Sequence, residues 1–201
     1  MDRVFRQYRL YRVFRAGAPI LAGVLRYQWL RLRRVIPGLR PTDLSWVRAH
    51  EKTGRALYRL AVGLGGAFVK AGQMMGSRAD FFPDALLGPL RNLHDSVPAR
   101  PFSVFRAHVA EELACKTEEA FSAVEEQPMA AASLAQVHEA TTTDGRRVII
   151  KVQYPEARKL FPLDLKIFRF VVKLVRLLHR KLDLRHLADE VARFVEMELD
   201  F

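Results

Sequence analysis

Two adjacent residues, Asp144 and Gly145, constrain the fold of this chain more than any other feature. They stand between the β-prone runs 134–140 and 147–153, and Asp-Gly readily takes the left-handed backbone angles of a hairpin turn. Helical spacing of apolar residues marks the segments on both sides, at 46–81, 103–121, 162–180 and 189–201. A small antiparallel sheet set between helices predicts an α+β fold.

The segment 46–81 is unusual because glycines recur inside its helical pattern, at positions 63, 65, 66, 72 and 76. Each glycine costs about 1 kcal/mol relative to alanine in an exposed helix interior. This cost is offset where a second element must lie close to the helix backbone. We therefore expect another part of the chain to pack tightly on this segment.

Positive charge is concentrated at the start of the chain. Residues 1–40 contain ten arginines and one acid, Asp2, and so carry +9 of the net charge of +11. The first five arginines, at positions 3 to 15, wind around a helix and do not form one stripe. This basic head suits an anionic surface such as acidic lipid, nucleic acid or an acidic partner, and a solvated helix without a partner fits equally well.

Neither a membrane-spanning helix nor a signal peptide is predicted. The longest uncharged apolar stretch of the head runs from Ala16 to Leu25 and contains Pro19, whereas a spanning helix needs about 20 apolar residues. A secretory signal places its charges before the apolar core and a cleavage site after it. Here the arginines between 26 and 34 follow the core instead.

The sheet region has the layout of a protein-kinase N-lobe. In such a lobe a flexible loop covers the nucleotide phosphates, a strand lysine binds them, and a helix glutamate orients that lysine. Here the run Ala130, Ala131, Ala132 and Ser133 precedes the hairpin, and Lys151 lies on the last strand. The run lacks the glycines of a kinase loop, so this motif alone favours a surface lysine.

A second group of polar residues lies on the glycine-containing segment. Lys70, Gln73 and Ser77 are spaced i, i+3 and i+7, so they share one helix face. Scattered solvent-facing residues give the same pattern. The neighbouring glycines favour a packed face.

Four motifs, in this order along the chain, resemble those of the UbiB-like (AarF-like) atypical kinase family. The first is K-x-G-Q at Lys70, Gly72 and Gln73, continued by Ser77, Arg78, Asp80 and Pro83 and by Leu93, Asp95 and Pro98. The others are the alanine-rich run 130–133 with 135–138, the lysine strand 151–155, and E-x-D at Glu198 and Asp200. Together they span residues 64–201, and the head carries none of them.

The resemblance implies a kinase-like N-lobe beneath a family-specific helical extension. It implies binding of ATP or ADP, with Mg²⁺, through Ala130, Ala131, Ala132, Ser133 and Lys151, and Glu190 is our first choice for the acid that orients Lys151. The extension would form a regulatory lid in which Lys70, Gly72, Gln73, Ser77, Arg78 and Asp80 face Glu198 and Asp200. Two neighbouring acids need a cation, so we expect Lys70 to pair with Glu198 or with both acids. We also expect the loss of that pair to cost far more than a surface change.

Three parts of the chain are predicted: a basic head at 1–40, a helical extension at 41–121 and the N-lobe at 122–201. A phosphoryl-transfer site also needs a catalytic-loop Asp, a metal-binding Asn and a D-F-G-type Asp from a C-lobe. This sequence contains none of them, so we expect no catalytic residue, no direct metal ligand and no phosphoryl transfer by this chain alone. It is interpreted as the N-terminal part of a longer family member, as a fragment or a natural truncation.

Family members support isoprenoid-lipid metabolism, such as that of ubiquinone, near membranes. The first hypothesis is therefore the N-terminal part of an atypical kinase or ATPase, cytoplasmic and peripheral to the inner face of the cytoplasmic membrane. Its expected partners are anionic lipid and quinone-biosynthesis proteins or lipid intermediates. The alternative is a non-catalytic adaptor that retains only the N-lobe and binds a membrane or a partner protein. Nucleic-acid binding is least favoured, because no recognised nucleic-acid module accompanies the arginines.

Overall fold

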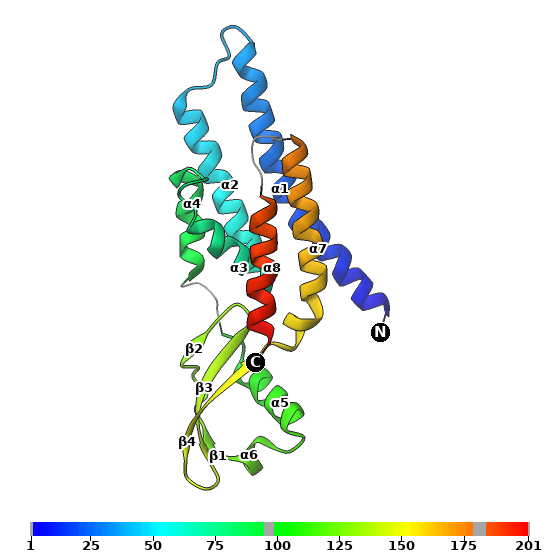
Figure 1. The fold of residues 1–201 in the computed structure, drawn as a ribbon, viewed down its shortest axis with the longest axis vertical. Helices are drawn as coiled ribbons and strands as arrows, with labels where there is room; N and C mark the ends of the chain where they lie inside the picture. Colours follow the sequence, from blue (N-terminus) through cyan, green and yellow to red (C-terminus); the bar gives the residue numbers. More distant parts are fainter. Residues whose placement is uncertain (1, 95–98, 179–183, 201) are drawn as a thin grey trace.

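The computed structural model of the protein describes residues 2–94, 99–178 and 184–200. The molecule is elongated, with long helices at one end and a small sheet at the other (Figure 1). The helical end contains α1 (Asp2–Val35), α2 (Asp43–Leu64), α3 (Gly66–Gly76), α4 (Asp84–Arg91), the 3₁₀ turn η1 (Asn92–His94), α7 (Pro155–Leu178) and α8 (Arg185–Leu199). The sheet end contains α5 (Phe102–Leu113), α6 (Thr117–Ala120), β1 (Phe121–Val124), β2 (Ala130–Ala131), β3 (Ala135–Thr142) and β4 (Arg147–Gln153). The predicted α+β fold, a mostly helical extension packed on a small antiparallel sheet, is confirmed.

The sheet is built around β3, and all its strand pairs are antiparallel. On one side β3 pairs with β4 along its length, from Ala135 opposite Gln153 to Thr141 opposite Arg147. On the other side β1 pairs with the end of β3 and β2 with its start. Pro128 lies between β1 and β2 and has no N–H for a ladder hydrogen bond, which explains why this edge is split in two.

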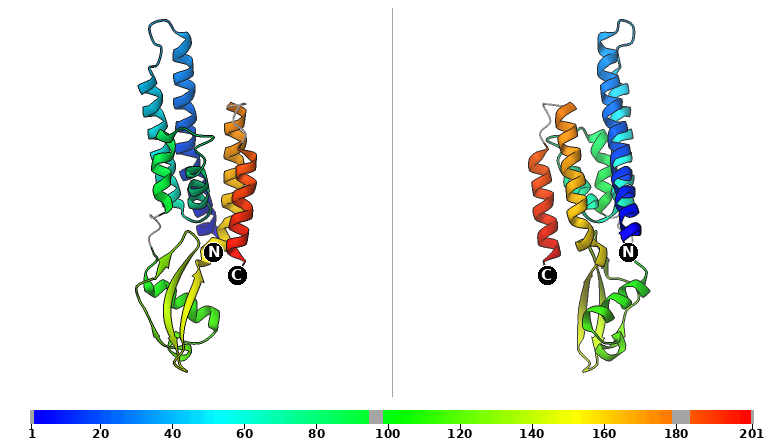
Figure 2. Two further views of the ribbon diagram at one scale, coloured as in Figure 1. Left: turned by 60° about the vertical axis from the view of Figure 1, so that its left-hand side comes forward. Right: turned by 90° about the vertical axis from the view of Figure 1, so that its right-hand side faces the viewer.

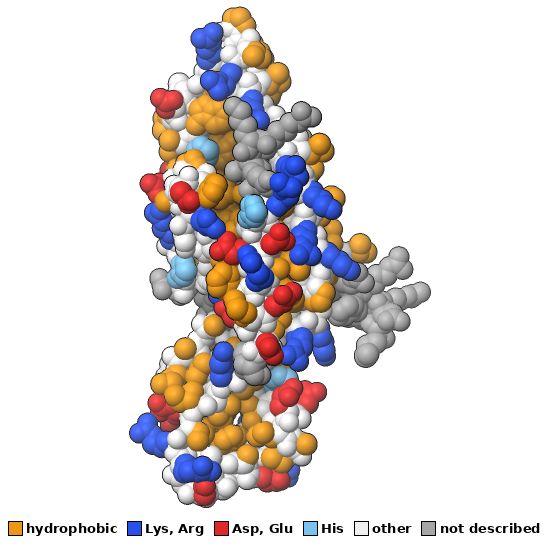
Figure 3. All heavy atoms as spheres, in the orientation of Figure 1, with side chains coloured by type: hydrophobic (Ala, Val, Ile, Leu, Met, Phe, Trp, Pro, Cys, Tyr) orange, Lys and Arg blue, Asp and Glu red, His pale blue; other side chains and the backbone are white. Residues whose placement is uncertain are grey.

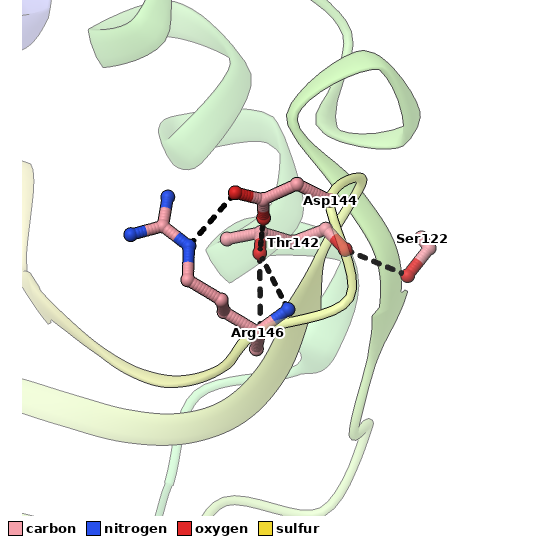
Figure 4. A network of polar contacts seen from close by, with 4 residues as sticks. All are labelled: Ser122, Thr142, Asp144 and Arg146. Carbon is pink, nitrogen blue, oxygen red and sulfur yellow. Dashed lines mark hydrogen bonds and ion pairs between the residues drawn. The ribbon is translucent and has the colours of Figure 1, made fainter.

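The predicted hairpin is present between β3 and β4, and side chains fix its turn (Figure 4). Gly145 has φ 86°, a left-handed conformation that favours glycine. Thr142 Oγ1 donates to Asp144, and Arg146 Nε donates to the same carboxylate at 2.8 Å. The hydrogen bond from Thr142 is the main cause that lowers the pKa of Asp144. Ser122 Oγ donates to the carbonyl of Thr142 at 3.1 Å and so ties β1 to the turn.

Three helix boundaries differ from the sequence expectations. The expected single helix 46–81 is two helices, because Gly65 and Gly66 have φ values of 68° and 50° and reverse the backbone between α2 and α3. The expected helix 103–121 ends at Leu113, where Ala114 takes φ 53°. The long helix expected from 162 or 164 begins at Pro155, since proline suits the first turn of a helix.

Two apolar clusters meet at α3. The first joins α1, α2, α3, α4 and Ile167 of α7, and the second joins α3, α7, α8, Leu134 and Tyr154. Figure 2 shows the α7–α8 pair standing beside the helices of the N-terminal half. Because α3 contributes to both clusters, it links the extension to the helices that follow the sheet.

Most of the basic head forms α1, and this helix is part of the packed structure. Ala16, Val24 and Leu30 are buried, and α1 packs along α2 and α7. Arg12 is only 2% exposed and pairs with Asp164 of α7. The charge of this arginine is therefore compensated inside the protein and does not contribute to a cationic surface. Within the described ranges, no helix combines the length and hydropathy needed to span a membrane.

Candidate functional site

The two faces of the sheet have different surroundings. Gln136 and His138 point to the face covered by α5, where the ring of Phe105 lies 3.9 Å from that of His138. Val137 and Lys151 point to the opposite face, together with Ile149, which is 63% exposed. The views in Figures 1 and 2 show no helix of the described chain over this second face. We call it the open face.

The structure brings Ala130 and Lys151 into one row on the open face. Ala130 stands opposite Val137, and Val137 stands opposite Lys151, so the three side chains project to the same side of the sheet. Two strand spacings separate Ala130 from Lys151, about 10 Å between their Cα atoms. One residue of the predicted phosphate-binding run, Ala130, and the predicted phosphate-binding lysine therefore lie on one surface.

The alanine-rich run is only partly a loop. Ala130 and Ala131 form β2, and the chain then turns at Ala132 and Ser133, where Ala132 N–H donates to the carbonyl of Ala135 at 2.8 Å. Ala131 stands opposite Gln136 and so belongs to the covered side of the sheet. This differs from the expectation of a flexible loop through 130–133, because strand pairing already satisfies part of the run's backbone.

The C-terminal end of α8 lies beside the exit of β4. Gln153 Nε2 donates to the carbonyl of Glu198 at 3.2 Å, and Arg158 donates to the carbonyl of Leu199 at 2.8 Å. These donors satisfy carbonyls that the end of a helix leaves without partners. Gln153 follows Lys151 by two residues and shares its side of the strand. The E-x-D end of α8 therefore lies on the same side as Lys151.

The predicted pair between the extension and the E-x-D motif is present. Lys70 Nζ, on α3, donates to the carboxylate of Glu198 and lies 5.7 Å from the ring centre of Phe194, one turn earlier on α8. The side chains of Lys70 and Glu198 are 22% and 37% exposed. The pair is thus partly screened by water, and for this degree of exposure we now predict only a small stability cost on its loss.

Glu190 has a different partner from the one that we expected. Arg78 donates to Glu190 at 2.7 Å, which makes a second ion pair between the extension and α8. Glu190 lies eight residues before Glu198, a rise of about 12 Å along the helix axis. The carboxylate of Glu190 therefore fastens α8 to the turn after α3 through Arg78.

The other residues of the predicted lid have more local contacts. Gln73 Nε2 donates to the carbonyl of Leu93 at 3.0 Å, and Ser77 Oγ donates to the carbonyl of Gln73 at 3.2 Å. A Cβ atom on Gly72 would stand 2.3 Å from Leu93 Cδ1, so this position requires a glycine as packed. Asp80 and Asp200 are exposed, and the motif residues 95–98 lie outside the described part of the chain.

A buried polar network beneath the sheet was not predicted. Gln136 Oε1 accepts from Arg100 N–H at 2.9 Å and from the Tyr154 hydroxyl at 3.3 Å, while its Nε2 contacts His138 Nε2 at 3.0 Å. His138 Nδ1 in turn contacts the carbonyl of Glu125 at 2.7 Å. The sequence did contain a signal for this network, because Gln136 and His138 alternate on one face of a predicted strand. The network fastens the chain entering α5 to the sheet.

A cavity of about 370 Å³ lies between the extension and the lobe. Its lining includes the α2–α3 break at Gly65 and Gly66, the turn at Ser133, and the ion pair of Arg12 with Asp164. Burial raises the pKa of Asp164 to about 6, against the lowering effect of the Arg12 guanidinium. Among the described residues, no group of three or more His, Cys, Asp and Glu side chains could hold a metal ion.

An antiparallel sheet with a lysine on its open face, followed by a helix pair, defines a kinase-like N-lobe. The family model described as "ABC1 atypical kinase-like domain" matches residues 92–201, just over half of the chain. The chain therefore belongs to the ABC1 atypical kinase-like family, which includes the UbiB- and AarF-like proteins. Membership in a kinase-like family implies the use of a nucleotide in general terms.

Curated relatives agree with this assignment. The chain is 31% identical to AarF domain-containing protein kinase 1 of Mus musculus over 191 residues, which cover 94% of this chain and 36% of the relative. It is 38% identical to the chloroplastic protein ACTIVITY OF BC1 COMPLEX KINASE 7 of Arabidopsis thaliana over 110 residues, 55% of this chain and 16% of the relative. The chain thus spans about a third or less of the length of these relatives.

Among solved structures, the complex of Rv3197 with erythromycin from Mycobacterium tuberculosis is 32% identical to the chain. The match covers 79% of this chain and 41% of that one, with a TM-score of 0.40.

Proposed function

We propose that this chain is the nucleotide-binding lobe and lid of an atypical kinase or ATPase that acts in isoprenoid-quinone or related lipid metabolism at a membrane surface. The observation that carries the proposal is the row of Ala130, Val137 and Lys151 on the open face of the sheet. A flat base needs an accessible apolar surface, and phosphates need a cation on a rigid element. The open face offers both, since Val137 and Ile149 flank Lys151 on the same side.

The described residues of this chain offer groups that would bind ATP but no clear ligand for the metal ion that accompanies it. Lys151 would bind the phosphates, and the turn at Ser133 would approach them from the sheet edge. Mg²⁺ would neutralise charge between the phosphates. Glu139 lies on the open face itself, opposite Ile149, and its carboxylate is paired with Arg147. Glu198 contacts Gln153 through its carbonyl, and its carboxylate is paired with Lys70. We therefore assign no direct metal ligand to the described residues.

The extension would act as a lid through its two ion pairs to α8. Lys70 and Arg78 fix α3 and the following turn against the helix whose end lies beside the open face. A protein substrate would need that same side of the sheet. The arrangement supports action on a small molecule or a lipid, and it opposes access by a folded protein substrate.

The test is a calorimetric titration of the full-length protein with ATP and ADP, with and without Mg²⁺. A Lys151→Ala variant should bind about tenfold more weakly or worse, since a charge-assisted hydrogen bond contributes about 1.5–3 kcal/mol. Lys52→Ala, which removes an exposed lysine on α2, is the matched control and should bind as the parent does. Failure of the parent protein to bind either nucleotide would instead favour the non-catalytic adaptor.

The membrane part of the proposal rests on the outer surface of α1. Leu10, Phe14 and Trp29 are 63%, 74% and 55% exposed, and arginines such as Arg33 and Arg34 lie along the same helix. Exposed apolar side chains among basic ones are the pattern of a helix that binds an anionic lipid surface. We place this binding at the inner face of the cytoplasmic membrane.

Deleting residues 1–40, the simplest test of the head, would also expose the apolar faces of α2 and α7 that α1 covers. Charge reversal is cleaner. The double variant Arg33→Glu/Arg34→Glu should pellet less with vesicles containing phosphatidylglycerol, since each basic residue near such a surface contributes about 1 kcal/mol. Lys52→Glu/Arg59→Glu, on α2, is the matched control. Equal pelleting of parent and head variant would remove the head from the membrane interaction.

A further inference from the structure

A second cavity lies among the helices of the extension, and it is separate from the open face. It has a volume of about 370 Å³ and is lined by residues of α1, α2, α3 and α4, of the segment 81–83, and of α7 and α8. Its lining is almost entirely apolar, and much of that lining is still accessible: Leu57, Phe82 and Val175 are only partly buried. Figure 3 shows hydrophobic side chains gathered on the surface of the helical end.

The cavity is long compared with its volume. On α2 the residues that line it run from Trp46 to Ala61, a rise of about 22 Å. On α1 they run from Ile20 to Arg31, about 16 Å. A volume of 370 Å³ lies at the small end of the range for ligand sites. A long and narrow apolar space suits a single extended chain better than a fused ring system.

One end of the cavity is polar. Tyr27 of α1 and His50 of α2 form a hydrogen bond of 2.8 Å there. The ring of Tyr27 stacks with that of Trp46, and the ring of His50 is tilted against it. Thr53 lies one turn below His50 and accepts a hydrogen bond of 2.9 Å from Arg26. Arg31 follows Tyr27 by one turn and completes this end. The polar groups therefore gather near the α1–α2 connection, and the remainder of the cavity is apolar.

The polar end of the cavity carries only positive charge among the described lining residues. The ionisable side chains among the described lining residues are Tyr27, Arg31 and His50, and none is acidic. Burial lowers the pKa of His50 and raises that of Tyr27, so at neutral pH both are uncharged. The positive charge at this end comes from Arg31, an exposed lining residue, and from Arg26, which donates to Thr53. A guanidinium presents paired donors to a carboxylate or phosphate.

We propose that this cavity binds a single-chain amphiphile with an anionic head, such as a fatty carboxylate. The head contacts Arg31 and the Tyr27–His50 pair, and the chain extends between α2 and α7 toward α3. This site is independent of the nucleotide proposal, because none of its lining residues lies on the sheet.

Trp46 lines the cavity, so it reports directly on binding. The protein has two tryptophans, and Trp29→Phe leaves Trp46 as the single one. In this background we would titrate three probes with the same tail, dodecanoate, dodecanol and dodecyltrimethylammonium, below their micelle concentrations and without vesicles. Dodecanoate should bind saturably and about tenfold more tightly than dodecanol, by the strength of a charge-assisted hydrogen bond. The ammonium probe should bind most weakly.

Variants separate the head from the chain. Arg31→Gln should weaken dodecanoate about tenfold and leave dodecanol unchanged, whereas Arg34→Gln, on the same helix, should change neither. Val175→Phe fills the apolar part and should weaken both probes, whereas Val47→Phe, the same change on an exposed site outside the lining, should weaken neither.

Three results would overturn the proposal: a signal that does not saturate, equal or tighter binding of the ammonium probe, or unchanged binding by a folded Val175→Phe protein. If Val175→Phe fails to fold by circular dichroism, Leu57→Phe replaces it. The melting temperature of the unaltered protein gives a second readout, because a ligand of the folded state must raise it. Lys151→Ala should bind dodecanoate normally even if it loses ATP.

Discussion

Arg12 and Asp164 form an ion pair in the interior of the helical end, and its removal should be the most damaging single change in the described chain. Arg12 Nε donates to Asp164 Oδ1 at 2.9 Å, a second guanidinium nitrogen contacts Oδ2 at 2.5 Å, and a third donates to the carbonyl of Leu64 at 3.1 Å. The two side chains are each 3% exposed. Solvent therefore cannot replace Arg12 when it is lost.

Removal of one partner from such a pair typically costs about 3–5 kcal/mol, because the other charge stays buried without compensation. We expect Arg12→Leu to lower the free energy of unfolding by this amount at pH 7.5. Arg12→Leu/Asp164→Leu should recover most of the loss, since two apolar side chains pack without a stranded charge. Arg15→Leu, an exposed change on the same helix, is the control and should cost less than about 1 kcal/mol.

The dependence on pH gives an independent check. The pKa of Asp164 is raised from its ordinary value of 3.8 to about 6, so the folded protein holds this proton more tightly than the unfolded chain does. The stabilisation from this group is then complete below about pH 4 and is lost as the pH rises through about 6, by about 3 kcal/mol in total. Asp164→Asn should remove that part of the pH profile. Arg12→Leu should also cost less at pH 5 than at pH 7.5, because the carboxyl is then neutral.

Urea denaturation followed by far-ultraviolet circular dichroism, at pH 4, 5, 6 and 7.5, measures all of these quantities. A loss below about 1 kcal/mol for Arg12→Leu at pH 7.5 would refute the reasoning, because that is the range of an exposed pair. A double variant less stable than Arg12→Leu would refute it as well.

Other changes test the remaining contacts. Lys70→Ala should change the unfolding free energy by only about 0–1 kcal/mol, because the pair of Lys70 with Glu198 is partly exposed. In the full-length protein the same variant should change the rate or the substrate preference of phosphoryl transfer. Ala131→Gly should measurably change the affinity of the full-length protein for ATP or ADP, because glycine lets the backbone beside the turn approach phosphate more closely; superimposable titration curves would place the phosphates elsewhere. Gly54→Ala should destabilise by about 1–3 kcal/mol, since its Cβ would lie 2.2 Å from the carbonyl oxygen of Leu86. Gly17→Ala, the same change inside α1 where no atom lies within 4 Å, should stabilise by about 0.5–1 kcal/mol in urea melts.

Local features of the sequence were sufficient to predict the sheet. Asp144 and Gly145 specify a turn through their own backbone preferences, and the alternation on either side follows from one buried face. The Lys70–Glu198 pair was also predictable, although 128 residues separate its partners. In that case the information came from the resemblance of both motifs to one family, and the periodicity of either helix does not contain it.

Contacts that depend on tertiary packing were not predictable in the same way. Arg12 is one of ten arginines in the head, and its spacing does not distinguish it from Arg9 or Arg15. Its burial depends on Asp164, which lies on a helix that approaches α1 only in the folded protein. Glu190 was assigned to Lys151 by analogy, whereas its carboxylate meets Arg78, because the turn after α3 reaches that part of α8.

Three ion pairs between residues that the structure describes, those of Arg12, Lys70 and Arg78, join parts of the chain more than 100 residues apart. They divide by exposure into two kinds, and this division bears on function. The buried Arg12–Asp164 pair holds α1 against α7, and its loss would be felt in stability. The pairs of Lys70 and Arg78 with α8 are 22–38% exposed at their side chains, so each contributes little to stability. They are two attachments, about 12 Å apart along one helix, and together they determine where α3 lies relative to the end of α8. A contact that is weak in stability but specific in position suits a lid, because it can open without unfolding the helices that it joins.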